Sequence, residues 1–131
     1  FMRLSMNDFL RFSRSAGLSW MQMAVLMHLH YKGPTEVMAC GELLQLSPAG
    51  ASQMIERLVQ QGLAQRSEAP DDRRVRLVDL TDAGRQLVDE SIEAQQRWLK
   101  PLLAALTEEQ RAAATETLRL LTAQAIRLET T

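Results

Sequence analysis

The sharpest structural signal in this sequence is the dipeptide Ser47-Pro48, which predicts the start of a helix. Serine is a favoured N-cap because its side-chain oxygen accepts a hydrogen bond from a free backbone N–H, and proline at the first helical position loses no bond. Downstream, Ala51, Ile55 and Leu58 share one helical face, and Gly62 ends the pattern. We therefore expect a short amphipathic helix with a polar outer face.

Three further helical segments are predicted upstream of this helix. Apolar residues recur at helical spacing over residues 2–15, and Ala16-Gly17 ends that segment. Ser19 is the expected N-cap of the second segment, which ends at Gly33-Pro34. A short third segment is expected around Gly41–Leu46.

Two strand-like runs, Leu63–Arg66 and Val75–Leu80, follow the Ser-Pro helix. The segment between them contains Pro70, Asp71 and Asp72, which are turn formers, so the runs predict a hairpin with a long tip. Two neighbouring carboxylates could also form an acid–base or cation site, but no His, Cys or third carboxylate lies nearby in sequence, which favours turn chemistry. Three arginines lie within four residues at this tip, at positions 73, 74 and 76. Clusters of arginines at a hairpin tip are usually surrounded by water and have no binding role. The helix that starts at Ser47-Pro48 favours a role in DNA binding for this one.

Long helices are predicted after Thr81. A heptad-spaced seam over residues 88–106 is interrupted by Pro101, which should bend the helix because its nitrogen cannot bond back along the chain. The segment Thr107–Gln110 predicts a capping box that opens a last helix, where Leu118, Leu121 and Leu128 share one stripe. An intrachain core would explain these stripes, but little globular body remains for them to pack on, which favours a homodimer. The residues expected at its interface are Phe9, Leu99, Leu102, Leu118, Leu121 and Leu128.

Three short helices followed by an arginine-tipped hairpin predict a mainly α fold with a small two-stranded β wing, a winged helix-turn-helix. In that arrangement the last helix enters the DNA major groove and presents its outer face to base edges. Gln53 can contact adenine through two hydrogen bonds, and Ser52 can serve a base or a phosphate. The candidate DNA-binding residues on this helix are Ser47, Ala49, Gly50, Ser52, Gln53 and Arg57. Arg57 has a structural alternative, an ion pair with the neighbours of Glu56 or with the wing, which we weigh equally with phosphate contact.

The chain resembles the MarR family of transcriptional regulators from about Leu18 to Glu90. The resemblance rests on several motifs in order, of which the most specific is Asp72-Arg73-Arg74-Val75-Arg76-Leu77-Val78-Asp79-Leu80-Thr81 with Gly84-Arg85. The others are Leu18-Ser19-Trp20-Met21-Gln22, Glu42-Leu43, Leu46-Ser47-Pro48, and Ile55-Glu56-Arg57-Leu58 with Gly62-Leu63. The resemblance implies one MarR-like domain over residues 1–131, with residues 18–84 as the winged helix-turn-helix lobe and residues 1–17 and 85–131 as dimerisation helices.

The resemblance also implies roles for individual residues. Arg74 is expected to enter the DNA minor groove, with Asp72 holding it in place and Arg73 near the backbone. Positions 49 and 50 often carry hydroxyl side chains in the family but are Ala and Gly here, which shifts the expected readout to Gln53, Ser52 and the wing. The family further implies a homodimer on a palindromic operator, most often a repressor, with a small aromatic or phenolic effector near His28 and Tyr31.

Composition excludes several classes of protein. The formal net charge of −1 and the pI near 6.2 exclude a basic protein but are compatible with a basic wing tip on a neutral body. The same near-neutral charge motivates an alternative function, a winged-helix protein–protein interaction module without DNA binding. No nucleophile–base pair, phosphate loop or metal-ligand spacing is present, so we expect no enzyme activity, cofactor or metal. His28 and His30 lie on different faces of a helix and cannot chelate one ion.

The remaining features concern the compartment in which the chain acts. The single cysteine, Cys40, cannot form an intrachain disulfide, which fits a reducing cytoplasm, and we expect an inert thiol because no basic group adjoins it. No apolar run reaches the length of a membrane span, and the first residues carry no secretion signal. Because the sequence opens on Phe1 rather than Met, we expect a trimmed chain or an incomplete first helix.

Overall fold

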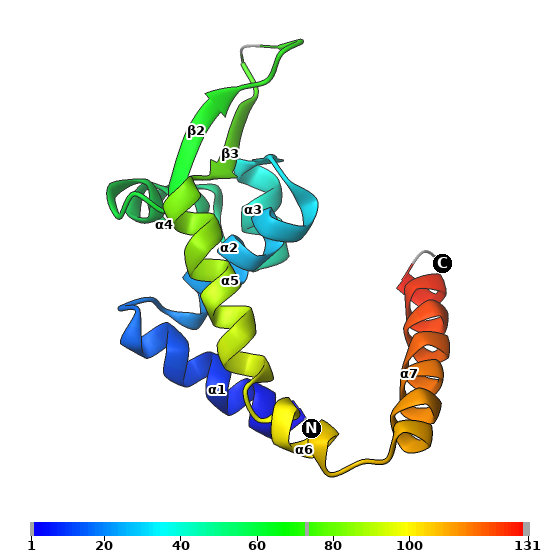
Figure 1. Ribbon diagram of the computed structural model, residues 1–131. Coiled ribbons are helices and arrows are strands. Elements are labelled where there is room, and N and C mark those ends of the chain that lie inside the picture. Colours follow the sequence, from blue (N-terminus) through cyan, green and yellow to red (C-terminus); the bar gives the residue numbers. More distant parts are fainter. Residues whose placement is uncertain (1, 73, 130–131) are drawn as a thin grey trace. The chain divides into compact units, whose positions relative to one another are not determined.

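The computed structural model describes residues 2–72 and 74–129 of the chain (Figure 1). The chain divides into two compact units, Phe1–Gln95 and Gln96–Thr131, which are described separately below. Arg73, one of the predicted tip residues, lies outside the described residues.

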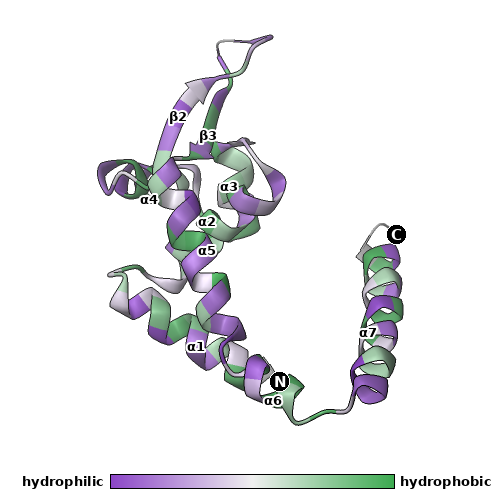
Figure 2. Cartoon of the chain, viewed as in Figure 1, coloured by the Kyte–Doolittle hydropathy of each residue, from purple (hydrophilic) through white to green (hydrophobic). Residues whose placement is uncertain are grey.

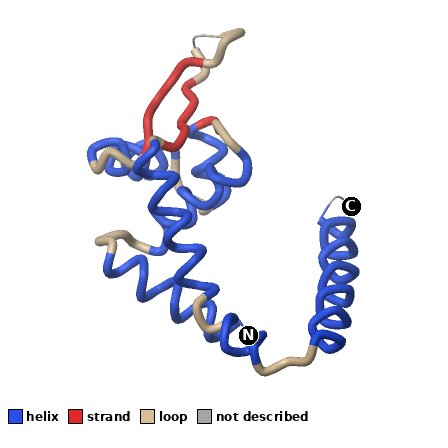
Figure 3. The backbone as a smooth tube through the Cα atoms, in the orientation of Figure 1, coloured by secondary structure: helices blue, strands red, loops and turns tan. Residues whose placement is uncertain are grey.

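The first unit is a set of helices with one small sheet (Figure 3). Its elements in order are α1 (Met2–Ser15), α2 (Trp20–Lys32), β1 (Thr35–Glu36), α3 (Val37–Leu43), α4 (Pro48–Gln60), β2 (Ala64–Glu68), β3 (Arg76–Leu80) and α5 (Asp82–Gln96). The predicted fold class, a mainly helical winged helix-turn-helix, is confirmed. Ser19 caps α2 through a full capping box with Gln22, as the sequence predicts for that helix start.

The sheet is antiparallel with strand order β1-β3-β2. The predicted two-stranded wing is formed by β2 and β3, in a register that pairs Ala64 with Leu80 and Glu68 with Arg76. The third strand, β1, was not predicted. It has only two residues, and Thr35 pairs with Val78, far away in sequence, so it carries no local pattern that sequence reasoning could detect.

One apolar core holds the first unit together. Met23, Leu26 and Leu29 of α2 are fully buried, and they cluster with buried residues of α4, β3 and α5. The cluster includes Ile55, Leu58, Val78, Leu80 and Val88. Burial of this many large apolar side chains is the main favourable term in folding. In Figure 2 the green, hydrophobic segments of α2 and β3 lie in the interior of this unit, and the wing beyond is mostly purple.

The bounds of α3 differ from the prediction. We expected a helix around Gly41–Leu46, but the helix spans Val37–Leu43 and Gly41 lies inside it. A Cβ atom at position 41 would lie 2.7 Å from the Cβ of Ala51 on α4. Glycine is therefore present because α3 and α4 approach closely here, not because a helix begins or ends at this position.

The second unit contains α6 (Leu99–Ala104) and α7 (Glu108–Glu129). The Thr107 capping box is confirmed, because the Thr107 hydroxyl accepts from the Gln110 amide at 3.2 Å and the Gln110 side chain accepts from the Thr107 amide at 2.9 Å. The long helix predicted after Thr81 does not bend at Pro101 but breaks at residues 97–98. Pro101 then occupies the first turn of α6, where backbone N–H groups have no partner within the helix. Within the described residues no helix combines the length and apolarity needed to cross a bilayer.

Candidate nucleic-acid interface

The helix α4 begins where the sequence predicts. Ser47 has an extended backbone, its hydroxyl accepts a hydrogen bond from the Gly50 amide at 3.1 Å, and Pro48 occupies the first helical turn. Ala51, Ile55 and Leu58 are buried on the inner face. This combination fixes both the position at which α4 starts and the face that it turns outward.

The outer face of α4 carries most of the predicted contact residues. Ala49, Ser52, Gln53 and Arg57 are exposed, and Gly50 is half-buried. Of the two readings of Arg57, the ion pair is not formed, since no ion pair among the described residues involves this side chain. Its guanidinium is therefore free to meet an anion from outside the chain.

The wing packs against this face of α4 through Arg66, a residue that sequence reasoning missed. The Arg66 Nη2 atom lies 3.4 Å from a carboxylate oxygen of Glu56, and it donates a hydrogen bond of 3.3 Å to the Ser52 carbonyl. The only sequence signal was a basic residue in a predicted strand, and nothing local indicates a partner ten or fourteen positions upstream.

The tip of the wing is shaped by Asp72. Its carboxylate accepts a hydrogen bond of 2.9 Å from the Arg74 amide, and its carbonyl accepts from the Val75 amide at 3.0 Å. Asp72 thus holds the backbone at Arg74, as an Asx turn does. Arg74 itself is exposed, and the neighbouring Arg76 pairs with Glu68 across the strands at 2.9 Å.

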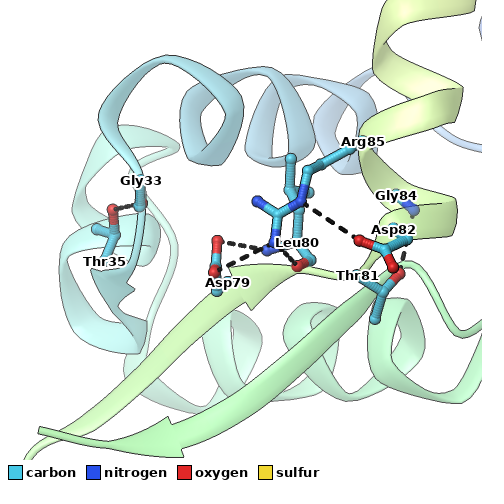
Figure 4. Close-up of polar contacts among 8 residues, drawn as sticks. All are labelled: Gly33, Thr35, Asp79, Leu80, Thr81, Asp82, Gly84 and Arg85. Carbon is cyan, nitrogen blue, oxygen red and sulfur yellow. Dashed lines mark hydrogen bonds and ion pairs between the residues drawn. The ribbon is translucent and has the colours of Figure 1, made fainter.

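The base of the wing is tied to α5 by a polar cluster (Figure 4). The Arg85 guanidinium donates to the Leu80 carbonyl at 2.9 Å and lies 3.7 Å from the Asp79 carboxylate and 3.9 Å from that of Asp82. Thr81 caps α5, since its hydroxyl accepts from the Gly84 amide at 3.1 Å. These contacts fix the direction in which the hairpin leaves the body of the unit.

The same hydroxyl of Thr81 also donates to the Gly62 carbonyl at 2.6 Å, which connects α5 to the end of α4. Gly84 faces the Leu63 backbone so closely that a Cβ atom would collide with the Leu63 carbonyl oxygen. The Gly84-Arg85 pair therefore allows close packing and supplies a hydrogen bond at the base of the wing.

The predicted effector residues, His28 and Tyr31, lie three positions apart on α2. Tyr31 is 67% exposed, its ring makes an edge-to-face contact with His30 at 5.1 Å, and His28 is half-buried. Cys40 is buried, and burial raises the pKa of its thiol, which agrees with an unreactive side chain. Across residues 2–72 and 74–129, no group of three His, Cys, Asp or Glu side chains could hold a metal ion.

The residues predicted for dimerisation differ in exposure. Leu118, Leu121 and Leu128 of α7 are 61%, 61% and 79% exposed, and Leu102 of α6 is 39% exposed. Leu99 is half-buried. Phe9 is half-buried as well and packs against the core of the first unit. The three leucines of α7 thus form an apolar stripe that the second unit itself does not cover.

A capped helix with a polar outer face, preceded by α3 and followed by an arginine-tipped hairpin, defines a winged helix-turn-helix protein. Comparison with known sequences then places it more narrowly: the sequence model of the MarR family matches residues 16–75. The HTH-type transcriptional regulator Mb0904 of Mycobacterium bovis is 32% identical over 111 residues, which cover 84% of this chain and 76% of that protein. The chain belongs to the MarR family, and the prediction that it is not an enzyme is confirmed by this membership.

Solved structures share the fold at low sequence identity. The transcriptional regulator Tm0710 from Thermotoga maritima matches with a TM-score of 0.85 and 19% identity, over 99% of this chain and 91% of that one. A mutant of S. aureus MepR bound to an oligodeoxyribonucleotide matches with a TM-score of 0.69 and 18% identity, over 92% and 89% of the two chains. The chain spans 46 to 62% of the lengths of three curated Bacillus subtilis relatives, YdgJ, YhbI and YwaE.

Proposed function

We propose that this protein is a ligand-responsive transcriptional repressor that acts in the cytoplasm as a homodimer on a palindromic DNA operator. The observation that carries the proposal is the outer face of α4: Ser52, Gln53 and Arg57 are exposed on a helix whose inner face is buried and whose start is fixed by Ser47. Such a helix can enter a major groove, because its polar side chains are free to meet base edges. The MepR mutant of the same fold supports this role, since it was solved with an oligodeoxyribonucleotide.

The wing supplies the second contact. Arg74 is exposed at a tip whose backbone Asp72 fixes, and an arginine in a narrow minor groove senses DNA shape more than base identity. The Leu118, Leu121 and Leu128 stripe supports the homodimer, because these apolar side chains are not covered within the second unit and a second copy of α7 could cover them. We place the effector, a small aromatic or phenolic compound, between α1, α2 and α5, near His28 and Tyr31.

The test is selection of a DNA site from a randomised duplex pool, followed by a gel shift on the selected sequence. We expect a palindrome whose half-site centres lie about one helical turn, or a multiple of it, apart. The Gln53→Ala variant should lose preference at one base pair per half-site by about 1–3 kcal/mol. An unenriched pool would contradict sequence-specific binding.

The formal charge of −1 favours a second candidate, a winged-helix protein–protein interaction module without DNA binding. The absence of polar side chains at Ala49 and Gly50 points the same way. The same experiment separates the two functions, since an interaction module selects no duplex even at low salt, where nonspecific contacts are strongest.

A further inference from the structure

Arg66 connects the two parts of the candidate interface. It lies on β2 at the base of the wing, and its Nη2 atom reaches α4 at both the Ser52 carbonyl and the Glu56 carboxylate. Ser52 and Glu56 are one helical turn apart on the same face. One guanidinium therefore holds β2 against the outer face of the helix that the proposed function places in the major groove.

Glu56 is an unfavourable residue for such a face. A free carboxylate there would be repelled by phosphates, or would accept a hydrogen bond from a cytosine amino group and alter sequence preference. In this protein both of its oxygens are engaged within the chain. One lies 3.4 Å from Arg66 Nη2, and the other accepts from the Gln60 side chain at 3.5 Å.

We propose that Arg66 is a positioning residue of the DNA-binding surface, which neutralises Glu56 and fixes the wing relative to α4. With Arg66 in place, Gln53 and the wing tip are presented at a constant spacing to a major groove and the adjoining minor groove. Without it, an uncompensated carboxylate faces the DNA and the wing loses a tie to the helix. This inference rests on the proposed function, because it requires that α4 and the wing bind DNA together.

The chain offers a matched control in a second arginine–glutamate pair. Arg76 and Glu68 lie opposite each other on β3 and β2, with 2.9 Å between a guanidinium nitrogen and a carboxylate oxygen. This pair carries the same charges on the same wing, but both of its members belong to the hairpin. A change in DNA binding that arises from charge alone should appear equally in both pairs.

The experiment is a pair of double-mutant cycles on the full chain, with affinity for the selected duplex measured by fluorescence anisotropy at several salt concentrations. We expect Arg66→Ala to weaken binding about tenfold, because a bridging cation is lost and a like charge is uncovered beside phosphates. Adding Glu56→Gln should restore affinity to within about threefold of the wild type, which shows as strong coupling in the cycle. Arg76→Ala and Glu68→Gln should act additively, with Arg76→Ala weakening binding by a few-fold.

Protection from dimethyl sulfate, which methylates guanine N7 in the major groove and adenine N3 in the minor groove, gives a readout that a general loss of stability would not change. In Arg66→Ala the protection of the minor groove by the wing should fade more than the protection of the major groove by α4. In Arg76→Ala both should weaken together. Arg66→Lys, which keeps the charge and can reach one partner, should recover most of the affinity. Arg66→Gln replaces the alanine variant if circular dichroism shows that Arg66→Ala is unfolded.

Two results would overturn the inference. The first is equal effects of Arg66→Ala and Arg76→Ala, and the second is additive behaviour of Arg66 and Glu56 in a protein that still selects its duplex. A wild-type chain that selects no duplex would instead contradict the proposed function itself.

Discussion

Replacement of Gly84 by alanine tests whether the base of the wing is packed as tightly as the structure shows. A Cβ atom at this position would collide with the Leu63 carbonyl oxygen and lie 3.0 Å from the Leu63 carbonyl carbon and 3.3 Å from Leu80 Cδ2. The obstacle is backbone, which cannot rotate aside as a flexible side chain can. The first turn of α5 must therefore move away from the end of α4.

The magnitude follows from the contacts that this movement breaks. Thr81 donates from its hydroxyl to Gly62 at 2.6 Å and from its amide to Leu63 at 3.2 Å, and each lost bond costs about 1 kcal/mol. Strain from overpacking adds about 1–3 kcal/mol. The higher helix propensity of alanine stabilises the variant by about 1 kcal/mol and offsets part of this loss. We expect Gly84→Ala to lower the free energy of unfolding by about 2–4 kcal/mol.

The assay is urea unfolding at one fixed protomer concentration, because a dimer gains stability with concentration. The midpoint should fall by about 1–2 M urea. Gly50→Ala is the matched control, since it also lies in the first turn of a helix. Its Cβ atom would meet only the Ser47 hydroxyl at 3.3 Å and Leu46 side-chain atoms at 3.7 and 4.0 Å. That variant should stay within about 1 kcal/mol of the wild type. A Gly84→Ala protein as stable as Gly50→Ala would refute the close approach of α5 to Leu63.

Three further predictions concern DNA binding, assembly and the thiol. Arg74→Ala should weaken operator binding by about 1–3 kcal/mol with the dimer intact, and an unchanged gel shift would remove the wing tip from the interface. Joint replacement of Leu118 and Leu121 by Asp places charges in the exposed apolar stripe, so sedimentation should show a monomer or an unfolded chain, and a stable monomer that binds the full palindrome tightly would contradict the homodimer. Burial raises the pKa of Cys40, so alkylation at pH 8 should be slow in the folded protein and fast in urea. The thiol of the unfolded chain ionises at lower pH than the thiol of the folded chain. The contribution of Cys40 to the free energy of unfolding should therefore be complete below its unfolded pKa and decline as the pH rises through the folded pKa. Equal rates of alkylation in the folded protein and in urea would contradict the burial of Cys40.

The parts of the fold that the sequence predicts correctly are those with local causes. At each of the N-caps Ser19, Ser47 and Thr107, the side chain accepts a hydrogen bond from an amide three residues further along the chain. Such local patterns can be recognised from the sequence alone. Burial of Ala51, Ile55 and Leu58 likewise follows from helical spacing alone. The outer face of α4, which carries the candidate contacts, was predicted by the same periodicity.

The features that were missed depend on contacts between distant segments. A helix was expected to begin around Gly41, yet Gly41 lies inside α3, at a position where the close approach of Ala51 leaves no room for a Cβ atom. Arg66 carries no local sign of its bonds to Ser52 and Glu56, since those partners come into reach only when β2 folds back on α4. The two-residue strand β1 exists only through its pairing with β3.

The connection between the wing and α5 couples the direction of the hairpin to that of the helix. Thr81 and Arg85 bind the end of β3 to the first turn of α5. Gly84 lets α5 pack directly against the Leu63 backbone, which leaves no space for the helix to shift relative to the base of the wing. A rotation of α5 is then passed to the hairpin as a rigid-body motion. The five residues of β3 span about 17 Å, so a rotation of about 10° displaces the far end of the strand by about 3 Å. That displacement is about half the width of a minor groove, which is about 6 Å. A small change in the direction of α5 is therefore enough to shift the wing relative to the groove.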